Sequence, residues 1–390
     1  MLQNASRRIA IVGAGPAGLV AARILQLRGF NPTVFEADVS TGVRDQGGTL
    51  DLHPETGQRA LELAGLHAAF LQQARFDDQD TRLLDHATAQ PLFEEILPSG
   101  TGDRPEIDRK ALRDLLLSSL RPDTVRWGHK LTSVEADAGS GRHVLTFING
   151  NAEAFDLVIG ADGAWSKVRA QLSGSVPSYT GVTFVECWLD DVDERHPDVA
   201  ELIGHGTMFA LHDNLGMIAQ RNSHGHVRLY AGFRRSMDWA MALGVDPGES
   251  AQVRAALLQL FAGWSPRLLN IIESCLDVIV QRPIYMLPVD FNWHSKAGLT
   301  LVGDAAHLMP PVGLGVNLAM LDAAELAMAL TPDGDWSEEI AQQEAIMQRR
   351  ARQEAPDALA TFNAMFASDS TIAVLQQMEM RREDATADSN

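Results

Sequence analysis

The residues best suited to chemistry near the N-terminus are three glycines, Gly13, Gly15 and Gly18, and a later acidic residue, Glu36. The glycines follow the spacing G-x-G-x-x-G. With that spacing the first glycine permits a tight turn, the second lets a pyrophosphate approach the backbone, and the third lets a helix pack closely on a strand. A carboxylate about 20 residues later can accept hydrogen bonds from ribose hydroxyls. The group predicts a dinucleotide site, and it does not distinguish FAD from NAD.

The segments around these glycines have the composition that such a site needs. Residues 9–12 predict a β-strand, residues 17–28 a helix, and residues 33–35 a second strand that ends at Glu36. Two arginines precede the first apolar stretch, as they would in a signal peptide, but the glycines interrupt that stretch. We therefore predict a strand and a glycine turn here, in a cytoplasmic protein.

Two later segments repeat the pattern of a strand that ends in glycine and aspartate. Residues 155–159 lead into Asp162-Gly163, and residues 299–302 lead into Gly303-Asp304. A carboxylate at a strand end, such as that of Asp304, can accept hydrogen bonds from a polyol chain. A glycine-rich loop and a helix predicted for residues 316–330 follow, and the positive end of that helix would face a developing anion. This stretch contains Pro311, Val312, Gly313, Gly315, Val316 and Asn317.

Residues 177–240 have a different pattern, in which short strands alternate with polar turns. In the last of them Val227, Leu229, Ala231 and Phe233 lie on one face, while Arg228 and Tyr230 lie on the other. This predicts an antiparallel sheet with one buried face, in a separate domain of the kind that binds a substrate. Four polar residues of these strands either contact a substrate or face solvent: Glu186, Thr207, Arg228 and Tyr230.

Several helices are also predicted. Residues 54–69 and 107–120 have helical periodicity, and the second segment carries Arg109 and Arg113 on one face. Residues 337–355 and 371–383 are strongly helical and are predicted to be split near Pro356 and at Ser368–Ser370. The C-terminal helix either forms a lid over a substrate entrance or acts as a packing strut.

Composition excludes several classes of protein. The chain has 390 residues, of which 45% are hydrophobic, so it is not disordered. Its formal net charge of −19 argues against binding to nucleic acid or to an anionic membrane surface. It contains no apolar run long enough to span a membrane, no metal-ligand cluster, no Ser-His-Asp arrangement and no sign of an obligate protein partner. His307, beside Asp304, is expected to be structural.

In order and spacing, the three glycine-containing motifs resemble those of the single-component flavin-dependent aromatic hydroxylases. Several segments are more similar still to the Tet(X)-like tetracycline destructases, which are flavin-dependent monooxygenases. These segments are residues 47–53, residues 105–107 with Arg109 and Arg113, residues 166–169, and residues 303–311 with Gly313, Gly315, Val316 and Asn317.

The resemblance implies a fold and a division into domains. The fold is α/β with an antiparallel β-sheet: a Rossmann-like FAD-binding domain, an inserted substrate-binding β-sheet domain and a C-terminal bridging helix. The FAD-binding domain would comprise residues 1–72, 103–176 and 296–330, and the substrate-binding domain residues 73–102 and 177–295. The C-terminal helices would occupy residues 331–390.

The resemblance also implies roles for individual residues. Gly13, Gly15, Gly18 and Glu36 would hold the ADP half of FAD. Asp51, Arg113 and Asp304 would contact FAD, Arg109 would lie near its phosphates or on the helix surface, and Asp162 with Gly163 would form the D-G motif. Arg44 would lie near NADPH. The isoalloxazine would be lined by Pro311, Gly313, Gly315, Val316 and Asn317.

The substrate residues depart from the destructase pattern. Glu186, Thr207 and Arg228 stand where the Tet(X)-like enzyme has Gln, Arg and His, and Val312 stands where it has Phe. We expect an FAD- and NADPH-dependent monooxygenase that inactivates tetracyclines with O2 through a flavin C4a-hydroperoxide, without a catalytic side chain or a metal. The alternatives are a hydroxylase of another phenolic or polyketide metabolite, and a non-catalytic protein that binds flavin or drug.

Overall fold

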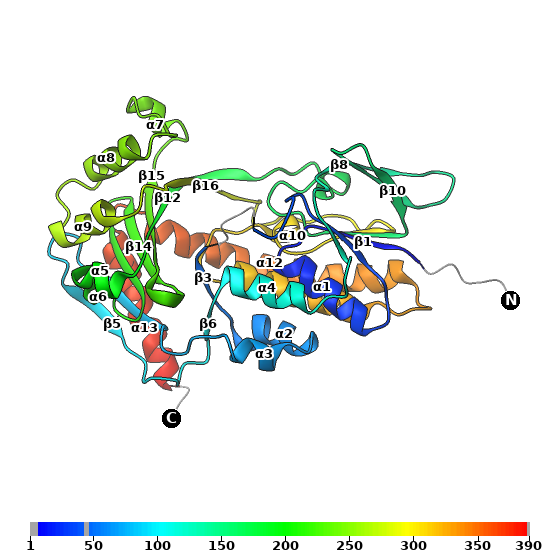
Figure 1. Cartoon of the computed structure of the whole chain (residues 1–390), viewed down its shortest axis with the longest axis horizontal. Coiled ribbons are helices and arrows are strands. Elements are labelled where there is room, and N and C mark those ends of the chain that lie inside the picture. Colours follow the sequence, from blue (N-terminus) through cyan, green and yellow to red (C-terminus); the bar gives the residue numbers. More distant parts are fainter. Residues whose placement is uncertain (1–6, 43–46, 388–390) are drawn as a thin grey trace.

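The computed structural model describes residues 7–42 and 47–387, so the predicted site residue Arg44 lies outside the described residues. A parallel sheet and a larger, mostly antiparallel sheet lie along the long axis of the molecule, and helices cover both (Figure 1). This arrangement confirms the predicted fold class, a Rossmann-like α/β unit combined with a separate β-sheet unit.

The parallel sheet has five strands in the order β17-β11-β1-β2-β7. Strand β1 lies at its centre, pairing with β11 on one side and with β2 on the other. All strands but the edge strand β7 are almost entirely buried, which is typical of a sheet covered on both faces. The strands are β1 (Ile9–Val12), β2 (Thr33–Phe35), β7 (Val125–Arg126), β11 (Leu157–Gly160) and β17 (Leu299–Leu301).

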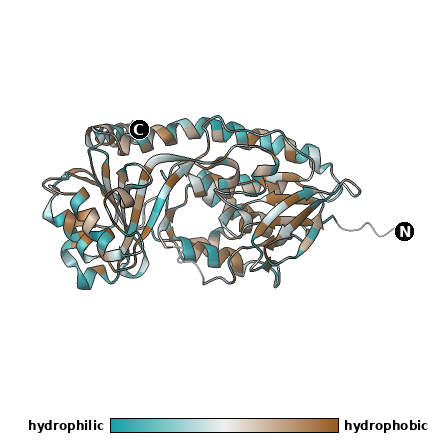
Figure 2. Ribbon diagram, turned by 90° about the horizontal axis from the view of Figure 1, so that it is seen from above, coloured by the Kyte–Doolittle hydropathy of each residue, from teal (hydrophilic) through white to brown (hydrophobic). Residues whose placement is uncertain are grey.

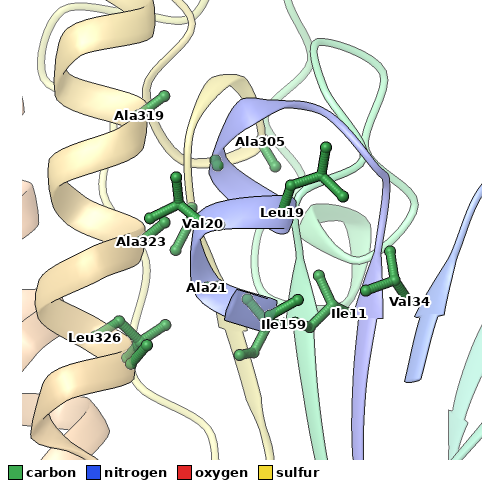
Figure 3. Packing of buried hydrophobic residues seen from close by; sticks show 14 of the residues in the cluster. Ile11, Leu19, Val20, Ala21, Val34, Ile159, Ala305, Ala319, Ala323 and Leu326 are labelled. Carbon is green, nitrogen blue, oxygen red and sulfur yellow. The ribbon is translucent and has the colours of Figure 1, made fainter. Parts of the chain in front are cut away.

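Helices α1 (Pro16–Leu27) and α11 (Gly315–Ala329) pack against each other beside this sheet. Val20 of α1 lies against Ala319 and Ala323 of α11, in a close-up that also shows Ile11 and Ile159 of the sheet beneath (Figure 3). Small alanine side chains at this contact let the helices approach closely. Gly303, just after β17, lies against Ala17 of α1 and Ala319 of α11, so the N-terminal ends of both helices lie on the same side of the sheet.

Smaller elements surround the parallel sheet. Strands β8 (Leu131–Ala136), β9 (His143–Phe147) and β10 (Ala152–Phe155) form an antiparallel sheet, and β3 (Thr49–Asp51) pairs with β6 (Glu106–Asp108). The predicted helix at 54–69 begins as the π-helical turn η1 (Pro54–Gln58) and continues as α2 (Arg59–Leu63). It is broken before α3 (His67–Leu71), where Gly65 adopts a φ of 67°. Helix α4 (Arg109–Ser118) begins later than predicted, since the preceding residues belong to β6.

The larger sheet has seven strands in the order β16-β12-β15-β14-β13-β4-β5. Only β13 and β4 run parallel, and every other neighbouring pair is antiparallel. Strands from two distant parts of the chain therefore share one sheet. They are β4 (Asp80–Leu84), β5 (Pro91–Glu95), β12 (Ser178–Leu189), β13 (Gly206–His212), β14 (Leu215–Arg221), β15 (Val227–Arg234) and β16 (Val280–Met286).

The prediction that this sheet has one buried face was wrong, because both faces are covered. One face packs on a cluster of helices, α5 (Val192–Arg195), α6 (Pro197–Ile203), α8 (Ser250–Leu260) and α9 (Pro266–Ser274), while α7 (Trp239–Ala242) adjoins them. The opposite face packs on residues of the C-terminal helices and of the loop before α11. Arg228 and Glu186 on that face are therefore nearly inaccessible to solvent, at 6% and 5% exposed.

The C-terminal helix α12 (Trp336–Met365) runs without interruption past both sheets (Figure 2). The predicted split near Pro356 was wrong, whereas the split predicted at Ser368–Ser370 is confirmed, because this helix ends at Met365 and the next begins at Ser370. Proline removes one backbone hydrogen bond, but the helix continues because Ala355, Ala358 and Phe362 are buried around that point. Helix α13 (Ser370–Ala387) follows and packs on β13 and β5. Among the described residues, none of the helices has the length and apolar character that crossing a membrane requires.

Replacing Gly18 by alanine tests the close contact between the start of α1 and the turn before it. Alanine is ordinarily favoured over glycine in a helix by about 1 kcal/mol. Here the added Cβ would lie 2.1 Å from the carbonyl oxygen of Gly13, and neither group can rotate away. The strain should win and lower the free energy of unfolding by about 1–3 kcal/mol. Chemical denaturation measures this, and an unfolding free energy at or above the wild-type value would contradict the contact.

Candidate functional site

The three glycines of the turn between β1 and α1 have two different kinds of surroundings. A Cβ on Gly13 would lie 2.2 Å from the carbonyl oxygen of Ala161, and one on Gly18 would meet the Gly13 carbonyl. These two glycines are needed for backbone packing. Gly15 differs, because a Cβ there would meet no atom within 4 Å. The turn therefore faces open space at the glycine that the sequence assigns to the pyrophosphate.

Two charged side chains hold this turn from opposite sides. The Glu36 carboxylate accepts hydrogen bonds from the backbone N–H groups of Ala14, at 2.7 Å, and Asp38, at 3.0 Å. The Arg113 guanidinium donates to the Ala14 carbonyl at 3.3 Å and is 3% exposed. Arg109, one helical turn earlier, is exposed and makes no side-chain hydrogen bond or ion pair with the described residues. The two arginines predicted to act together thus occupy different environments.

Asp162 follows β11 and organises the next loop. Its carboxylate accepts hydrogen bonds from the Ser166 hydroxyl, at 2.5 Å, and from the Lys167 backbone N–H, at 2.7 Å. Desolvation raises the pKa of Asp162, and these hydrogen bonds partly oppose the rise. Gly163 adopts a φ of 75°, which suits glycine. The buried Arg169 donates to the carbonyls of Ala164 and Ala305, so it ties this loop to α10 (Asp304–His307).

Asp304, at the start of α10, occupies a recess in the protein. Its side chain is exposed to solvent. Even so, desolvation by the surrounding protein raises its pKa, against the opposing charges of His307, Arg109 and Arg169. A carboxylate can be open to water and also surrounded by protein only where the surface is concave. The recess lies beside the carboxyl end of β17, on the same side of the sheet as the Gly15 turn.

The loop before α11 closes over Asp51, at the end of β3. Gly313 adopts a φ of 91°, and a Cβ there would lie 3.8 Å from both carboxylate oxygens of Asp51. Pro311 and Gly313 are exposed, and a Cβ on Gly315 would point into open space. Val316 is half-buried. This loop therefore presents backbone, with few side chains, to whatever lies in the recess.

Asn317 fixes this loop from behind. Its side-chain oxygen accepts hydrogen bonds from the His53 and Gly57 N–H groups, at 2.9 and 3.2 Å. Its amide nitrogen donates to the carbonyls of Asp51, at 2.8 Å, and Gly313, at 3.1 Å. The Asn317 side chain is fully buried, and both its amide oxygen and its amide nitrogen are hydrogen-bonded within the protein. Asn317 therefore holds the loop in its shape and does not extend from it toward a ligand.

The face of the seven-stranded sheet nearest this loop combines apolar rings with a few polar groups. Val312 packs into a cluster that includes Phe184, Phe362 and Phe366. Next to it, the Glu186 carboxylate pairs with Arg228 at 3.1 Å and with Arg282. Glu186 and Arg228 are therefore not solvent-facing. Thr207 is half-buried on β13, opposite Gln220 of β14.

Tyr230 brings this sheet face close to the loop at Gly48, just before β3. A Cβ on Gly48 would lie 2.8 Å from the Tyr230 hydroxyl oxygen and 3.7 Å from Nε of Arg109. The Tyr230 hydroxyl makes no hydrogen bond within the described part of the chain, and burial raises its pKa. Among the described residues, its O–H and the Arg109 guanidinium are consequently two donors without a hydrogen-bond acceptor beside the same glycine.

Glu106 is a buried carboxyl that the sequence gave no reason to select. It lies on β6 directly opposite Asp51 of β3 and accepts a hydrogen bond from the Thr49 hydroxyl. Desolvation, together with the Asp51 charge, raises its pKa to about 8. Like charges opposite each other on antiparallel strands repel, so Glu106 is protonated near neutral pH.

These features fit FAD. The glycine turn leaves open space for a pyrophosphate, the Asp304 recess suits a polyol chain, and the exposed loop at Pro311 and Gly313 leaves room for a flat ring. A model of the FAD-binding domain family matches residues 7–240 and 292–335. The chain belongs to this family. Its relatives are monooxygenases, and the chain is an FAD-dependent monooxygenase.

Two fungal proteins illustrate the relationship. The monooxygenase asqM of Emericella nidulans is 34% identical over 381 residues, covering 85% of each chain. The monooxygenase penA of Penicillium thymicola is 34% identical over 376 residues, covering 85% of this chain and 86% of its own.

Solved structures share the fold at lower identity. HpxO of Klebsiella pneumoniae, complexed with FAD and uric acid, has a TM-score of 0.79 at 22% identity, covering 95% of this chain and 92% of its own. The tetracycline destructase Tet(55) has a TM-score of 0.73 at 21% identity, covering 97% and 96%.

Local motifs in the sequence mark the glycine turn and the strand-end aspartates, but no local motif marks the residues that only folding brings together. Glu106 and Asp51 lie far apart in the chain and meet across two short strands. Arg282 joins Glu186 from β16, and no spacing in the sequence marks that contact. Asp322, described below, sits on a buried helix face with no polar neighbour in sequence to indicate a role.

Gly15→Ala isolates ligand binding from folding, with Gly18→Ala as its matched control. The added methyl meets no protein atom, and Gly15 has an extended backbone at φ −80° that alanine adopts easily. The variant should therefore unfold like the wild type and bind FAD at least about tenfold more weakly, a loss of about 1.4 kcal/mol. FAD release on dilution of the holoenzyme measures this. Unchanged FAD affinity would show that no phosphate approaches Gly15.

Glu106→Gln tests the buried proton. The folded-state pKa of about 8 lies above the ordinary value of 4.5, so folding takes up a proton between these pH values. Wild-type stability should then fall as pH rises through that window, by up to about 1.4 kcal/mol per unit. Glutamine stays neutral, so the variant should gain stability relative to the wild type from about pH 5 to about pH 8. Urea denaturation across this range measures the difference, and parallel curves would contradict the assignment.

Proposed function

We propose that this monooxygenase uses NADPH and O2 to hydroxylate a small ring molecule that carries enol or phenol oxygens. The sheet face opposite the flavin loop supports this most directly. It combines the half-buried apolar side chains of Phe209, Ile284 and Val312 with a few polar groups, among them the Tyr230 hydroxyl. A mostly apolar site with few directed donors suits a flat, oxygen-substituted ring.

The chain's own residues would bind the cofactor and position the substrate. When bound, FAD supplies the redox chemistry, accepting hydride from NADPH and passing on one oxygen atom of O2. The turn at Gly15, packed in place by Gly13 and Gly18, would carry the pyrophosphate, and Glu36 the ribose. Asp51, Arg113 and Asp304 would hold FAD, Arg109 would lie near it, and Arg44 would lie near NADPH. The ring would rest on Pro311, Gly313, Gly315 and Val316, with Asn317 fixing that loop from behind and Asp162-Gly163 beside it.

The same proposal assigns the domains. Residues 1–72, 103–176 and 296–330 would form the FAD-binding domain, and residues 73–102 and 177–295 the substrate-binding domain. In support, β4 and β5 from the first substrate segment join one sheet with β12–β16 from the second. Residues 331–390 would bridge the two.

Tetracyclines are the second, narrower candidate for the substrate. The resemblance of residues 47–53 and 105–113 to the tetracycline destructases favours them. Glu186, Thr207, Arg228 and Val312, which replace the residues of that pattern, would give a tetracycline different contacts. The buried pairing of Glu186 with Arg228 is one such difference.

One assay separates these candidates. NADPH oxidation is followed with no substrate, with tetracycline, and with a panel of simple phenols, and the masses of the products are measured by mass spectrometry. A hydroxylase should consume NADPH faster with its substrate and yield a product about 16 Da heavier. Tetracycline-dependent turnover would support the narrower candidate. Retention of unmodified ligand at a stoichiometric ratio would instead indicate a non-catalytic binding protein.

A further inference from the structure

A row of charged side chains leads from helix α12 through α11 to the short helix α10, which begins with Asp304. Arg350 of α12 pairs with Asp322 of α11, and Asp322 in turn pairs with His307, whose Nε2 lies 2.7 Å from the other carboxylate oxygen. His307 and Asp322 are 3% and 2% exposed. Asp304 lies at the opposite end of the same short helix α10. From α12 inward the charges therefore alternate in sign.

Such a row is not explained by stability. Removing three charges from water is costly, and well-packed apolar side chains of similar volume hold a fold as well or better. The row is better explained if it fixes the position of a neighbouring segment. That segment is α10, which has only four residues and is too short to be oriented by packing alone.

Helix α10 is held at two sides. Arg169 donates to the carbonyls of Ala305, at 3.1 Å, and Asp304, at 3.4 Å, and so fixes the side facing the Asp162 loop. His307 fixes the other side through Asp322. The Asp304 carboxylate takes part in neither of these hydrogen bonds and lies exposed in the recess described above.

We propose that His307, Asp322 and Arg350 are positioning residues that hold α10 so that the Asp304 carboxylate stays aimed at FAD and ionised. They do not touch the cofactor; they act through Asp304. This inference rests on FAD binding alone and is independent of which substrate the enzyme oxidises.

The electrostatics of the row agree with this role. Desolvation lowers the pKa of His307, but the Asp322 and Asp304 carboxylates outweigh it, and the net direction is upward. The resulting imidazolium, with Arg169 and Arg109, opposes the rise in the pKa of Asp304. On the far side, Arg350 and its second partner Glu325 flank Asp322. FAD affinity should therefore weaken as pH rises through the raised pKa of His307 and the imidazolium is lost.

Asp322→Asn tests the proposal, with Glu325→Gln as its matched control. The control removes the partner of Arg350 that lies at the protein surface and leaves the link to α10 intact. FAD dissociation is measured by flavin fluorescence after dilution of the holoenzyme, and circular dichroism checks the fold. Asp322→Asn should weaken FAD binding about tenfold or more, and Glu325→Gln by less than about twofold. Unchanged FAD affinity in a folded Asp322→Asn variant would overturn the proposal.

A double variant distinguishes positioning from a merely structural strut. If Asp322 acts through Asp304, the pair Asp304→Asn and Asp322→Asn should weaken FAD binding no more than Asp304→Asn alone. Additive losses would show that Asp322 acts elsewhere, and the proposal would fail.

Should Asp322→Asn not fold, His307→Gln provides the test. Glutamine can still donate to Asp322 but carries no charge. FAD affinity of this variant should no longer vary with pH in the range where the wild type does. A pH profile identical to the wild type would overturn the proposed role of the imidazolium.

Discussion

The cofactor side of the molecule depends on how closely the turn at Gly13 approaches the backbone at Ala161. That contact brings the ends of β1 and β11 together and seats the first turn of α1 on them. Atoms fill the space on the protein side of the turn, and the other side, at Gly15, is left open. The open space at Gly15 thus results from close packing that a residue larger than glycine would prevent. Glu36 and Arg113 hold the same turn and so keep that space open.

Buried charge has a consistent use in this acidic chain. Arg113, Arg169, Arg228 and Arg350 are each largely withdrawn from solvent, and each contacts either a carboxylate or backbone carbonyls that belong to a different element. The guanidinium group suits this because its planar fork can satisfy two acceptors at once. The net charge of −19 therefore describes the surface, whereas the junctions between elements are organised by interior cations.

Much of the fold could be predicted because its signals are local. The glycine spacing, the alternation along β15 and the helical period of the C-terminal segment each involve a few neighbouring residues. The failures have a common cause in tertiary contacts. Pro356 does not end α12, because burial on either side of it outweighs one lost hydrogen bond. The polar face of β15 is buried because other elements cover it, and the Glu106–Asp51 and His307–Asp322 pairs exist only once distant strands and helices have met.

The order of strands in the parallel sheet has a consequence for synthesis. Strand β1 leaves the ribosome first and takes the central place, but β11 and β17, on one side of it, are made much later. At a rate of about 5–20 residues per second, roughly 15–60 s separate β1 from β17. During the first part of that interval, until β11 is made, the nascent chain carries β1 without its neighbour on that side. The seven-stranded sheet, complete once β16 is made, can fold before the sheet that begins the chain.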